Sequence, residues 1–498
     1  MEKNTLSEII EIRKKEINEL ISNNVDVYPH RVNLTHSAKE ALESEEKTKV
    51  SCAGRVMQLR LMGKASFVHI QDRTAKIQLY IKRDNVGQES YDFFKKHIRV
   101  GDFVQVQGLI FTTKTGEKTI NADKLVLISK AIRPMPEKWH GIHDTEIRFR
   151  HRHLDLLANQ KAKDIFILRS KVMQAIRSTF DKKDYLEVET PTLCHSAGGA
   201  NARPFTTFHN ALKMPLFMRI ATELYLKRLV VGGLERVYEI AKVFRNEGID
   251  TRHNPEFTML EAYEAYSDYN GMAKLFEDIM QSCCDKLGKT EVEYRGKKIN
   301  LKPPFRKLYM PKLWKEKCGA DIHEVLDGKK FNDAALVKLA KKLEIECGED
   351  TPSAKIFERI FDEKILPTLF EPAFVFDHPT AITPLAKCKK GDTSLVERFE
   401  FFAGTEEIAN AYTELNDPQD QNERLKEQIR QKEVEKNQET DIIDSDFVQA
   451  LEMGMPPTGG IGVGIDRLIM LLSGNPSIRE VILFPTLKSE HQSSDKEE

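Results

Sequence analysis

Cysteine is scarce in this sequence and is not arranged for cross-linking. The seven cysteines among 498 residues include no C-x-x-C pair. A disulfide framework has an even set of cysteines in a short chain, and a structural zinc site needs closely paired ones. The cysteine pattern therefore suits reduced thiols better than either, and we expect a cytoplasmic protein. The cysteines occupy positions 52, 194, 283, 284, 318, 347 and 388.

Long apolar runs are also missing. No stretch approaches the ~20 apolar residues of a membrane span, and the first 21 residues mix acids and bases through their apolar positions, unlike a secretory signal. We expect no membrane partner. The capping-box pattern from Thr5 to Glu8 predicts a helix over residues 5 to 21 that packs on the body. Contact of its basic residues with tRNA or a membrane surface is the alternative.

An excess of either charge is absent from the chain as a whole. It has 76 basic and 77 acidic side chains, a net charge of −1, which argues against a chain-wide nucleic-acid coat. The charges are nevertheless separated along the sequence. Residues 50 to 138 contain 16 basic and 8 acidic side chains, whereas residues 139 to 498 carry a net charge of −7. A basic domain attached to an acidic body can still bind RNA.

The residue pattern changes along the chain and predicts the domains. Residues 1–49 form an N-terminal helix and linker. Residues 50–140 hold five short apolar or alternating segments punctuated by glycine, typical of a small Greek-key barrel such as an OB-fold. Residues 141–161 are a predicted hinge. Residues 162–498 alternate helical and strand patterns, which favours an α+β body on an antiparallel sheet flanked by helices, with a mostly helical insertion at about 300–390.

Glycines cluster in the segment GGIGVGIDR, which ends at Arg467. A dinucleotide fingerprint needs G-x-G-x-x-G, but from Gly460 the spacing is G-x-G-x-G with Ile465 in the last position, and the lysine of a P-loop is absent. Alternate glycines favour a strand that a ligand or another backbone approaches closely. Arg467 then lies at the start of the next helix. A bulged strand with a surface arginine is the alternative.

A second cluster consists of two predicted strands joined by a charged loop, FRNEG to RHNPEFTMLEAY. On the downstream strand Phe257, Met259, Glu261 and Tyr263 share one face, because side chains alternate along a strand. A carboxylate among apolar neighbours is costly unless it meets a cation. Either Arg245 pairs with Glu261 as a structural ion pair, or both serve a ligand.

Two further acids, Glu400 and Glu407, bracket the segment FEFFAGTEE. Mg²⁺ usually takes one or two protein carboxylates together with substrate phosphates. The spacing therefore allows a magnesium site. A solvated acidic face is the commoner explanation for spaced glutamates and stays open from these residues alone.

These segments together resemble the class II aminoacyl-tRNA synthetases, subclass IIb, and among them the lysine-specific enzymes. The strand ending in Glu189-Thr190-Pro191 is similar to the first family motif, FRNEG through RHNPEF to the second, and GIGVGIDR to the third. The resemblance covers nearly the whole chain. It implies a homodimer that forms through the first motif, activation of L-lysine by ATP with Mg²⁺, and transfer of lysine to the terminal adenosine of a tRNA with a UUU-type anticodon.

The resemblance also implies roles for single residues. Catalysis would depend on Arg245 at the α-phosphate and Arg467 on the other side of the nucleotide, with magnesium held by Glu400 and Glu407. The residues matching the ATP site are Arg245, Glu247, His253, Asn254, Phe257, Glu400 and Arg467. Those matching the lysine site are Gly199, Glu223, Arg245, Glu261, Tyr263, Asn410, Tyr412 and Glu414.

In the barrel, Phe67, Gln78 and Glu117 match family positions that contact the central uridine of the anticodon. OB-folds bind single-stranded bases by aromatic stacking and contacts to base edges, so these residue types suit the task. Taken alone, Phe67 in an alternating strand is more typical of a core residue.

Charge favours lysine over the substrates of related enzymes, because two acids and a tyrosine accept a cation and repel an aspartate side chain. An aspartyl- or asparaginyl-tRNA synthetase is the nearest alternative, since those enzymes share the barrel-first order. A second alternative is an inactive RNA-binding paralogue, against which the intact Arg245, Glu400, Glu407 and Arg467 argue. A third is a paralogue that lysylates a protein, but that relative lacks the barrel.

Overall fold

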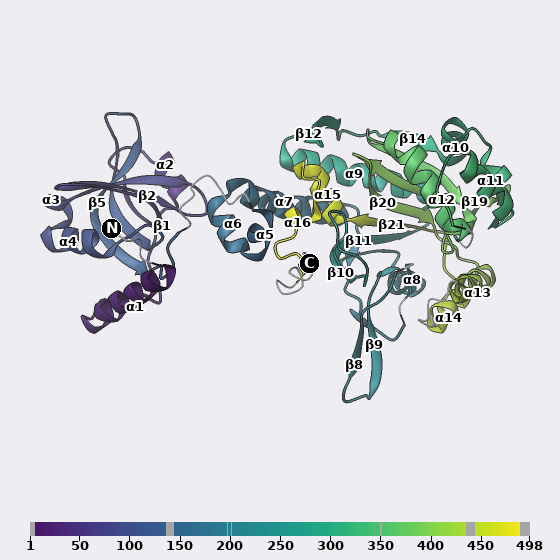
Figure 1. The fold of residues 1–498 in the computed structure, drawn as a ribbon, viewed down its shortest axis with the longest axis horizontal. Coiled ribbons are helices and arrows are strands. Elements are labelled where there is room, and N and C mark those ends of the chain that lie inside the picture. Colours follow the sequence, from purple (N-terminus) through teal and green to yellow (C-terminus); the bar gives the residue numbers. More distant parts are fainter. Residues whose placement is uncertain are drawn as a thin grey trace, which may run out of the picture. The chain divides into compact units, whose positions relative to one another are not determined.

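The computed structural model describes residues 5–135, 144–196, 198–200, 202–348, 351–434 and 444–488. The chain divides into two compact units, Met1–Trp139 and His140–Glu498, which are described separately (Figure 1). The start of the predicted hinge, residues 141–143, and the C-terminal tail from residue 489 lie outside the described residues.

The first unit is a closed five-stranded barrel with strand order β1-β2-β3-β5-β4. Strands β1 and β4 pair antiparallel to close it, and β3 and β5 pair parallel. The OB-fold is therefore confirmed. The elements of this unit are α1 Leu6–Ser22, α2 Ala38–Glu43, β1 Lys49–Met62, β2 Ala65–Gln71, β3 Lys76–Lys82, α3 Arg83–Val86, α4 Gln88–His97, β4 Phe103–Thr112 and β5 Lys118–Ser129.

Helix α1 packs on this barrel, as its pattern predicts. Thr5 and Glu8 form the capping box at its start. Ile17 and Leu20 are buried in the barrel core, and Arg13 Nη1 donates a hydrogen bond to the Ala131 carbonyl at 2.9 Å. Arg13 is one of the basic residues for which RNA or membrane contact was the alternative. It instead holds the helix to its own unit. Among the helices that the structure describes, none is long and apolar enough to cross a bilayer.

The second unit is built on a nine-stranded sheet with the order β14-β17-β19-β20-β21-β11-β10-β6 and β18 paired to β19. The central strands are antiparallel, whereas the edge strands β14 and β6 pair parallel to their neighbours. The predicted antiparallel sheet therefore holds for the central strands. The sheet strands are β6 Leu186–Glu187, β10 Arg236–Phe244, β11 Glu256–Ala265, β14 Arg306–Tyr309, β17 Ala373–Pro379, β18 Cys388–Lys389, β19 Asp392–Ala403, β20 Glu406–Thr413 and β21 Thr458–Gly464.

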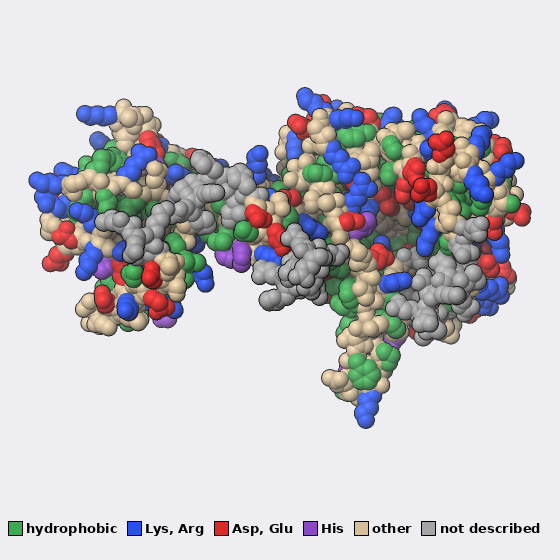
Figure 2. Space-filling model, in the orientation of Figure 1, with side chains coloured by type: hydrophobic (Ala, Val, Ile, Leu, Met, Phe, Trp, Pro, Cys, Tyr) green, Lys and Arg blue, Asp and Glu red, His purple; other side chains and the backbone are tan. Residues whose placement is uncertain are grey.

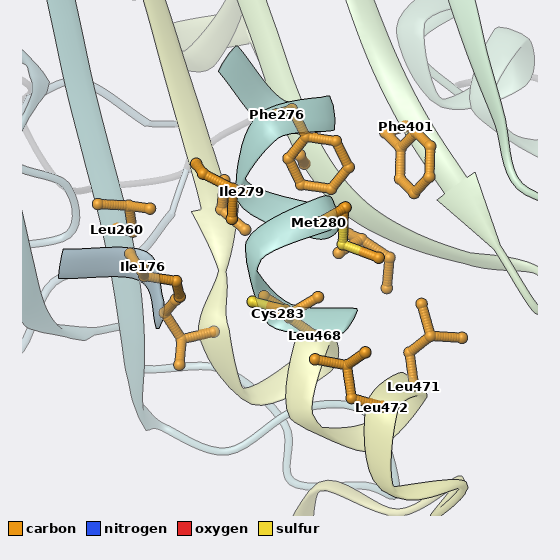
Figure 3. Close-up of a cluster of buried hydrophobic side chains, with 14 of the residues drawn as sticks. Ile176, Leu260, Phe276, Ile279, Met280, Cys283, Phe401, Leu468, Leu471 and Leu472 are labelled. Atoms are coloured by element: carbon orange, nitrogen blue, oxygen red, sulfur yellow. The ribbon is translucent and has the colours of Figure 1, made fainter. Parts of the chain in front are cut away.

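Helices cover one face of this sheet and bury its apolar side chains (Figure 3). Leu260 of β11 and Phe401 of β19 point toward Phe276 and Met280 of α9 and toward Leu468 of α15. The opposite face of the same strands is left for polar side chains. The longer helices of this unit are α7 Gln160–Lys182, α8 Glu223–Val231, α9 Tyr269–Leu287, α13 Pro418–Val434, α14 Ser445–Glu452 and α15 Ile465–Ser473.

Residues 144–158 of the predicted hinge form two helices, α5 Thr145–Arg150 and α6 Arg152–Ala158. They are anchored to the second unit, because Arg148 makes a two-point ion pair with Glu480, and the buried Arg152 donates to the carbonyls of Arg479, Ile482 and Leu483. The hinge prediction is wrong for this segment, since its arginines supply buried hydrogen bonds rather than a solvated linker.

The predicted insertion at 300–390 is too wide at both ends. Strands β14 and β17 lie in the main sheet, so the helical segment runs between them. Its helices are α10 Met310–Cys318, α11 Asp333–Lys342 and α12 Ser353–Ile360, and it has its own core around Trp314 and Phe357, whose rings stack at 4.5 Å. The apolar run of β17 is buried on both faces, so it carries no alternation that would mark it as a strand.

Candidate active site

The polar face of the sheet carries a row of site residues across adjacent strands. Glu261 of β11 lies opposite Gly462 of β21, Gly462 opposite Asn410 of β20, and Asn410 opposite Glu400 of β19. In the next row Tyr263 lies opposite Gly460, which lies opposite Tyr412. Strands distant in sequence are thus brought together in the way that the predicted lysine site requires. A cleft of about 1930 Å³ opens over this face.

Alternate glycines of β21 form the floor of the cleft. A Cβ added at Gly462 or Gly464 would meet only ordinary contacts, at 3.9 and 3.7 Å, so the space above these residues is not filled by protein. Gly460 differs, because its Cβ would lie 2.0 Å from Glu414 Oε1 and 2.5 Å from the Tyr263 ring. The strand with close ligand approach is therefore supported over the bulged surface strand.

Arg245 follows β10, and its guanidinium forms no ion pair with a described residue. Its charge lies 5.2 Å from the centre of the Phe257 ring, and its buried Nε has no hydrogen-bond partner among the described residues. Burial lowers the pKa of Arg245, while Glu247, Glu407 and Glu261 act in the opposite direction. The structure shows no ion pair between Arg245 and Glu261, so the purely structural pairing of these residues is not formed. A buried cation without a partner is expensive unless a ligand supplies the anion.

Arg467 lies at the first turn of α15, where its neighbour Asp466 fixes the helix. Buried Asp466 accepts hydrogen bonds from Arg169 and from the backbone N–H of Thr258, both at 2.6 Å. Arg467 Nη1 donates to the Glu407 carbonyl at 3.0 Å, and its Nη2 lies 3.4 Å from His253 Nε2. The guanidinium is therefore held at the cleft by weak contacts on two sides.

Acidic and tyrosyl side chains gather at the other end of the cleft. Tyr412 donates to Glu223 Oε2 at 2.9 Å, and Tyr263 Oη lies 3.4 Å from Glu261 Oε2. Burial, followed by repulsion from Glu223, raises the pKa of Glu261 to about 7. Burial and the nearby acids also raise the pKa of both tyrosines well above the usual value, so they stay hydrogen-bond donors. Glu414 Oε1 lies beneath Gly460 and has no hydrogen-bond partner among the described residues, whereas Glu414 Oε2 forms an ion pair with a lysine.

A buried lysine that the sequence reasoning missed pairs with two of these acids. Lys227 Nζ lies 2.6 Å from Glu223 Oε1 and forms a short ion pair with Glu414, and its side chain is fully buried. Burial acts to lower the pKa of Lys227, but Glu223 and Glu414 outweigh burial and raise it. The Glu-x-x-x-Lys spacing of residues 223 and 227 is the sequence signal that could have indicated it.

Arg398 is a second residue that the sequence reasoning missed. Its Nε donates to Asn410 Oδ1 at 2.9 Å, Nη1 to Thr383 Oγ1 at 2.9 Å and Nη2 to Glu400 Oε1 at 2.5 Å. The Asn410 oxygen is therefore occupied and its amide N–H groups remain available. Arg252 also lines the cleft and pairs with the buried Glu406 at 3.2 Å.

Glu407 lines the cleft, whereas Glu400 is not among the lining residues and is bonded to Arg398, which is. Burial and then repulsion from Glu400 raise the pKa of Glu407, which indicates an excess of negative charge between the two carboxylates. The described residues include no group of three or more His, Cys, Asp or Glu side chains that could hold a metal by themselves. The donor set fits a magnesium ion that takes its remaining ligands from phosphate oxygens and water.

The remaining predicted site residues also lie at the cleft, and they differ in whether their side chains are already hydrogen-bonded. Gly199 has φ +87°, and a Cβ there would lie 3.2 Å from that of Ala221. Glu247 is exposed and lines the cleft. His253 is bonded to Asp250 at 2.9 Å. Asn254 donates to the Glu256 carbonyl and accepts from the Thr486 N–H, so its side chain holds the loop together.

The three predicted anticodon residues lie in the barrel. Phe67 alternates with buried neighbours on β2, so it is half-buried on the face opposite the core, and its ring lies 5.1 Å from that of Tyr80. Gln78 donates to Glu117 Oε2 at 2.8 Å, and His69 Nε2 lies 2.9 Å from Glu117 Oε1. The core interpretation of Phe67 is wrong.

Comparisons with known proteins agree with this geometry. The family of class II tRNA synthetases for D, K and N matches residues 144–488, and the family of OB-fold nucleic acid binding domains matches residues 50–128. The lysine-tRNA ligase of Bacillus subtilis is 46% identical over 494 residues, which cover 97% of this chain and 98% of the relative. The chain belongs to the lysine-tRNA ligases, within the class II tRNA synthetases.

Other lysine-tRNA ligases show the same extent of similarity. That of Thermoanaerobacter sp. strain X514 is 46% identical over 97% of this chain and 96% of its own length. That of Clostridium acetobutylicum is 48% identical over 93% and 90%. The class IIb resemblance, the ligase activity and its substrate lysine are thus confirmed, and the aspartate, asparagine and inactive alternatives are set aside.

Proposed function

We propose that this lysine-tRNA ligase binds lysine along the β11 face of the cleft, with the substrate carboxylate toward Arg245 and the ε-ammonium toward Tyr263 and Glu414. The observation that carries this assignment is the distribution of unpaired charge. Arg245 is a half-buried cation without an ion pair among the described residues, whereas Glu261 and Glu414 are buried acids whose oxygens have few donors. A zwitterion with a cationic side chain satisfies both ends. Exchange of pyrophosphate into ATP that requires lysine tests the function, and the variants below test the assignment.

Each end of the proposed lysine site has its own contacts. Glu223, with Gly199 beside it, receives the α-amino group. The free amide N–H groups of Asn410, which Arg398 leaves exposed to the cleft, join Arg245 at the carboxylate. Tyr412 lies between the two ends and orients Glu223 through its hydroxyl. Because the tyrosines and Asn410 are themselves bonded, the site is preorganised and needs little reordering on binding.

ATP occupies the other part of the cleft in this proposal. Its adenine stacks on Phe257, the open space above Gly462 and Gly464 accommodates the nucleotide, and Arg467 and His253 contact it from α15 and the loop. Glu247 lines the same region, and Asn254 shapes the loop rather than contacting ATP with its bonded amide. Arg245 lies between the two substrates, on the ring of Phe257.

The chemistry needs little from the protein beyond position and charge. The lysine carboxylate is already ionised and attacks the α-phosphorus, pyrophosphate leaves, and the tRNA 3′-hydroxyl later attacks the resulting adenylate. Arg245 and Arg467 neutralise charge on the phosphate oxygens in the transition state. Glu400 and Glu407 would hold Mg²⁺, which would supply positive charge against the phosphate oxygens.

The barrel is proposed to read a UUU-type anticodon of the lysine tRNA. The outward faces of Phe67, Tyr80 and Phe111 form a connected aromatic strip, with ring centres 5.1 and 6.0 Å apart. Gln78 and Glu117 lie next to it and offer edge contacts to a base. Lys and Arg side chains gather around α3 and α4 on the face shown in Figure 2, where they can meet phosphates.

Phe67→Ala is expected to raise the KM for tRNA in charging by about 10- to 100-fold, because one base stack contributes ~1–3 kcal/mol. Lysine-dependent exchange should not change, since Phe67 lies in the barrel and the exchange reaction uses the other unit. Steady-state charging and exchange measured on the same preparation check this. Phe94→Ala, which removes a buried core ring, serves as the control for barrel stability. An equal loss in both reactions would show a folding defect rather than an anticodon contact.

The pH dependence of lysine binding should follow Glu261. Its pKa of about 7 means that the carboxylate is partly protonated in the empty cleft, and only its ionised form attracts an ammonium. Lowering the pH from 8 to 6 should therefore weaken lysine binding about tenfold, the protonation cost of one group with that pKa. Calorimetry without ATP measures this. Glu261→Gln should bind lysine more weakly and without this slope, and a slope that persists in the variant assigns the titration to another group.

A homodimer and a cytoplasmic location complete the proposal. Ile167, Leu186 and Leu193 are about half exposed, at 47, 51 and 48%, in and near the segment that matches the first family motif, which suits an interface between two copies. The β8–β9 arm, Thr206–His209 and Met214–Met218, carries a further apolar patch (Figure 2). All seven cysteines are free, as expected in a reducing compartment.

A further inference from the structure

The charges that surround the proposed lysine site can be counted from their ion pairs. Three buried acids face it, Glu223, Glu261 and Glu414. A fourth acid nearby, Glu239, already pairs with Arg219 at 2.7 Å. Two further acids, Asp444 and Asp420, pair with Arg228 and Arg424. Of these six acids, only the first three have no arginine partner among the described residues.

Lys227 supplies one such cation from inside the protein. Its ammonium lies between Glu223 on its own helix and Glu414 on the strand side, and it takes one oxygen of each. The rings of Tyr412 and Phe447 lie 5.7 and 5.8 Å from it, which closes the site against water. The Lys227 side chain is fully buried, so water cannot take the place of its ammonium between the two acids.

The remaining charge then complements the substrate. With all three acids ionised, they and Lys227 leave a net charge of −2, and Arg245 adds +1 without an ion pair at the other end of the site. Lysine carries two ammonium groups and one carboxylate. We propose that Lys227 is a specificity-determining positioning residue, which neutralises one of the three acids so that the site is balanced by a ligand with two cations. This inference rests on the lysine site proposed above.

The two acids that Lys227 joins also receive different ends of the substrate. Glu223 keeps its second oxygen for Tyr412 and the α-amino group, and Glu414 keeps its second oxygen, beneath Gly460, for the ε-ammonium. Lys227 therefore orients both carboxylates with one group. Without it, two buried carboxylates would lose the ammonium that pairs with both, and an uncompensated buried charge is strongly unfavourable.

The charge count predicts how variants discriminate lysine from norleucine, which has the same chain length and lacks the ε-ammonium. Glu414→Gln leaves one negative charge for two ammonium groups, so the preference for lysine should fall about tenfold or more. Lys227→Met/Glu414→Gln removes one charge of each sign and restores the net charge of −2. Its preference for lysine should therefore exceed that of Glu414→Gln about tenfold and approach the wild-type value.

The dissociation constant of L-lysine is measured by calorimetry and that of L-norleucine by competition, and their ratio gives the preference. Both are measured on the full chain, and the melting temperature of each variant is recorded. A merely structural role for Lys227 predicts that the double variant discriminates no better than Glu414→Gln, and that result overturns the proposal. If the methionine variant does not fold, Lys227→Gln/Glu414→Gln replaces it, because it removes the same two charges. The same results support or overturn the proposal. A wild-type protein that binds norleucine as tightly as lysine would instead contradict the lysine site itself.

Discussion

Replacing Arg245 with methionine is expected to lower lysine-dependent ATP–pyrophosphate exchange by about 10³-fold, the upper range for losing one donor that stabilises transition-state charge. Arg245 is placed to contact both the lysine carboxylate and the α-phosphate, so the KM for lysine and the maximal rate should both suffer. The melting temperature should not fall. The residue is half-buried and its buried Nε has no hydrogen bond, so its removal takes away a partly desolvated charge rather than an ion pair.

Two arginines of the same unit are matched controls. Arg219 is buried and pairs with Glu239, so Arg219→Met should lower stability by ~3–5 kcal/mol. Arg236 is 46% exposed and pairs with Glu264 at the surface, so Arg236→Met should change neither stability nor exchange appreciably. Exchange kinetics and calorimetric unfolding measure both quantities. If Arg245→Met keeps exchange within tenfold of the wild-type rate, its role at the reacting atoms is wrong.

Arg467→Ala is expected to raise the KM for ATP and to lower exchange by at least about 10²-fold, because the guanidinium supplies fixed positive charge to the nucleotide phosphates. Among the described residues, its guanidinium bonds the Glu407 carbonyl at 3.0 Å, Glu407 Oε2 at 3.4 Å and His253 Nε2 at 3.4 Å, so it is weakly held and can turn toward a ligand. Helix α15 should stay in place, since Asp466 anchors it to Arg169 and Thr258.

Initial rates of exchange at saturating lysine and varied ATP measure this effect. Arg467→Lys keeps the positive charge but loses the paired N–H donors of the guanidinium, so its exchange rate should lie between those of the wild type and Arg467→Ala. Asp466→Asn is the control for a displaced helix, because it weakens a buried charged anchor and should lower the melting temperature, which Arg467→Ala should not. An unchanged KM for ATP in Arg467→Ala would remove Arg467 from the nucleotide site.

The sequence predicted the parts of this protein whose signals are local. The alternation of β11 placed Phe257, Met259, Glu261 and Tyr263 on one face, and that face is the cleft wall. The glycine pattern of β21 indicated close approach, and Gly462 and Gly464 leave open space. The barrel followed from short alternating strands separated by glycine. In each case the pattern and the burial agree because one face meets a core.

Long-range pairing is what the sequence could not provide. Lys227 follows Glu223 by four residues, which on sequence alone is the spacing of an exposed helical ion pair. Its burial depends on Tyr412, Glu414 and Phe447, which lie about 185 to 220 residues further along the chain. Arg398 has nearer partners, because Glu400 is two residues away, but Asn410 and Thr383 come from other elements. The hinge was misassigned for the same reason, since the partners of Arg148 and Arg152 lie near residue 480.

The measurement that tests the proposed cleft most directly is pyrophosphate exchange with each of the twenty amino acids, repeated with norleucine. Three buried acids against one buried lysine, and one guanidinium without an ion pair, predict exchange with L-lysine and none above background with aspartate, asparagine or norleucine. Glu261→Gln should reduce the lysine-dependent rate, because it removes one of the three acids. Exchange supported equally by aspartate or norleucine would contradict the proposed charge complementarity of the cleft.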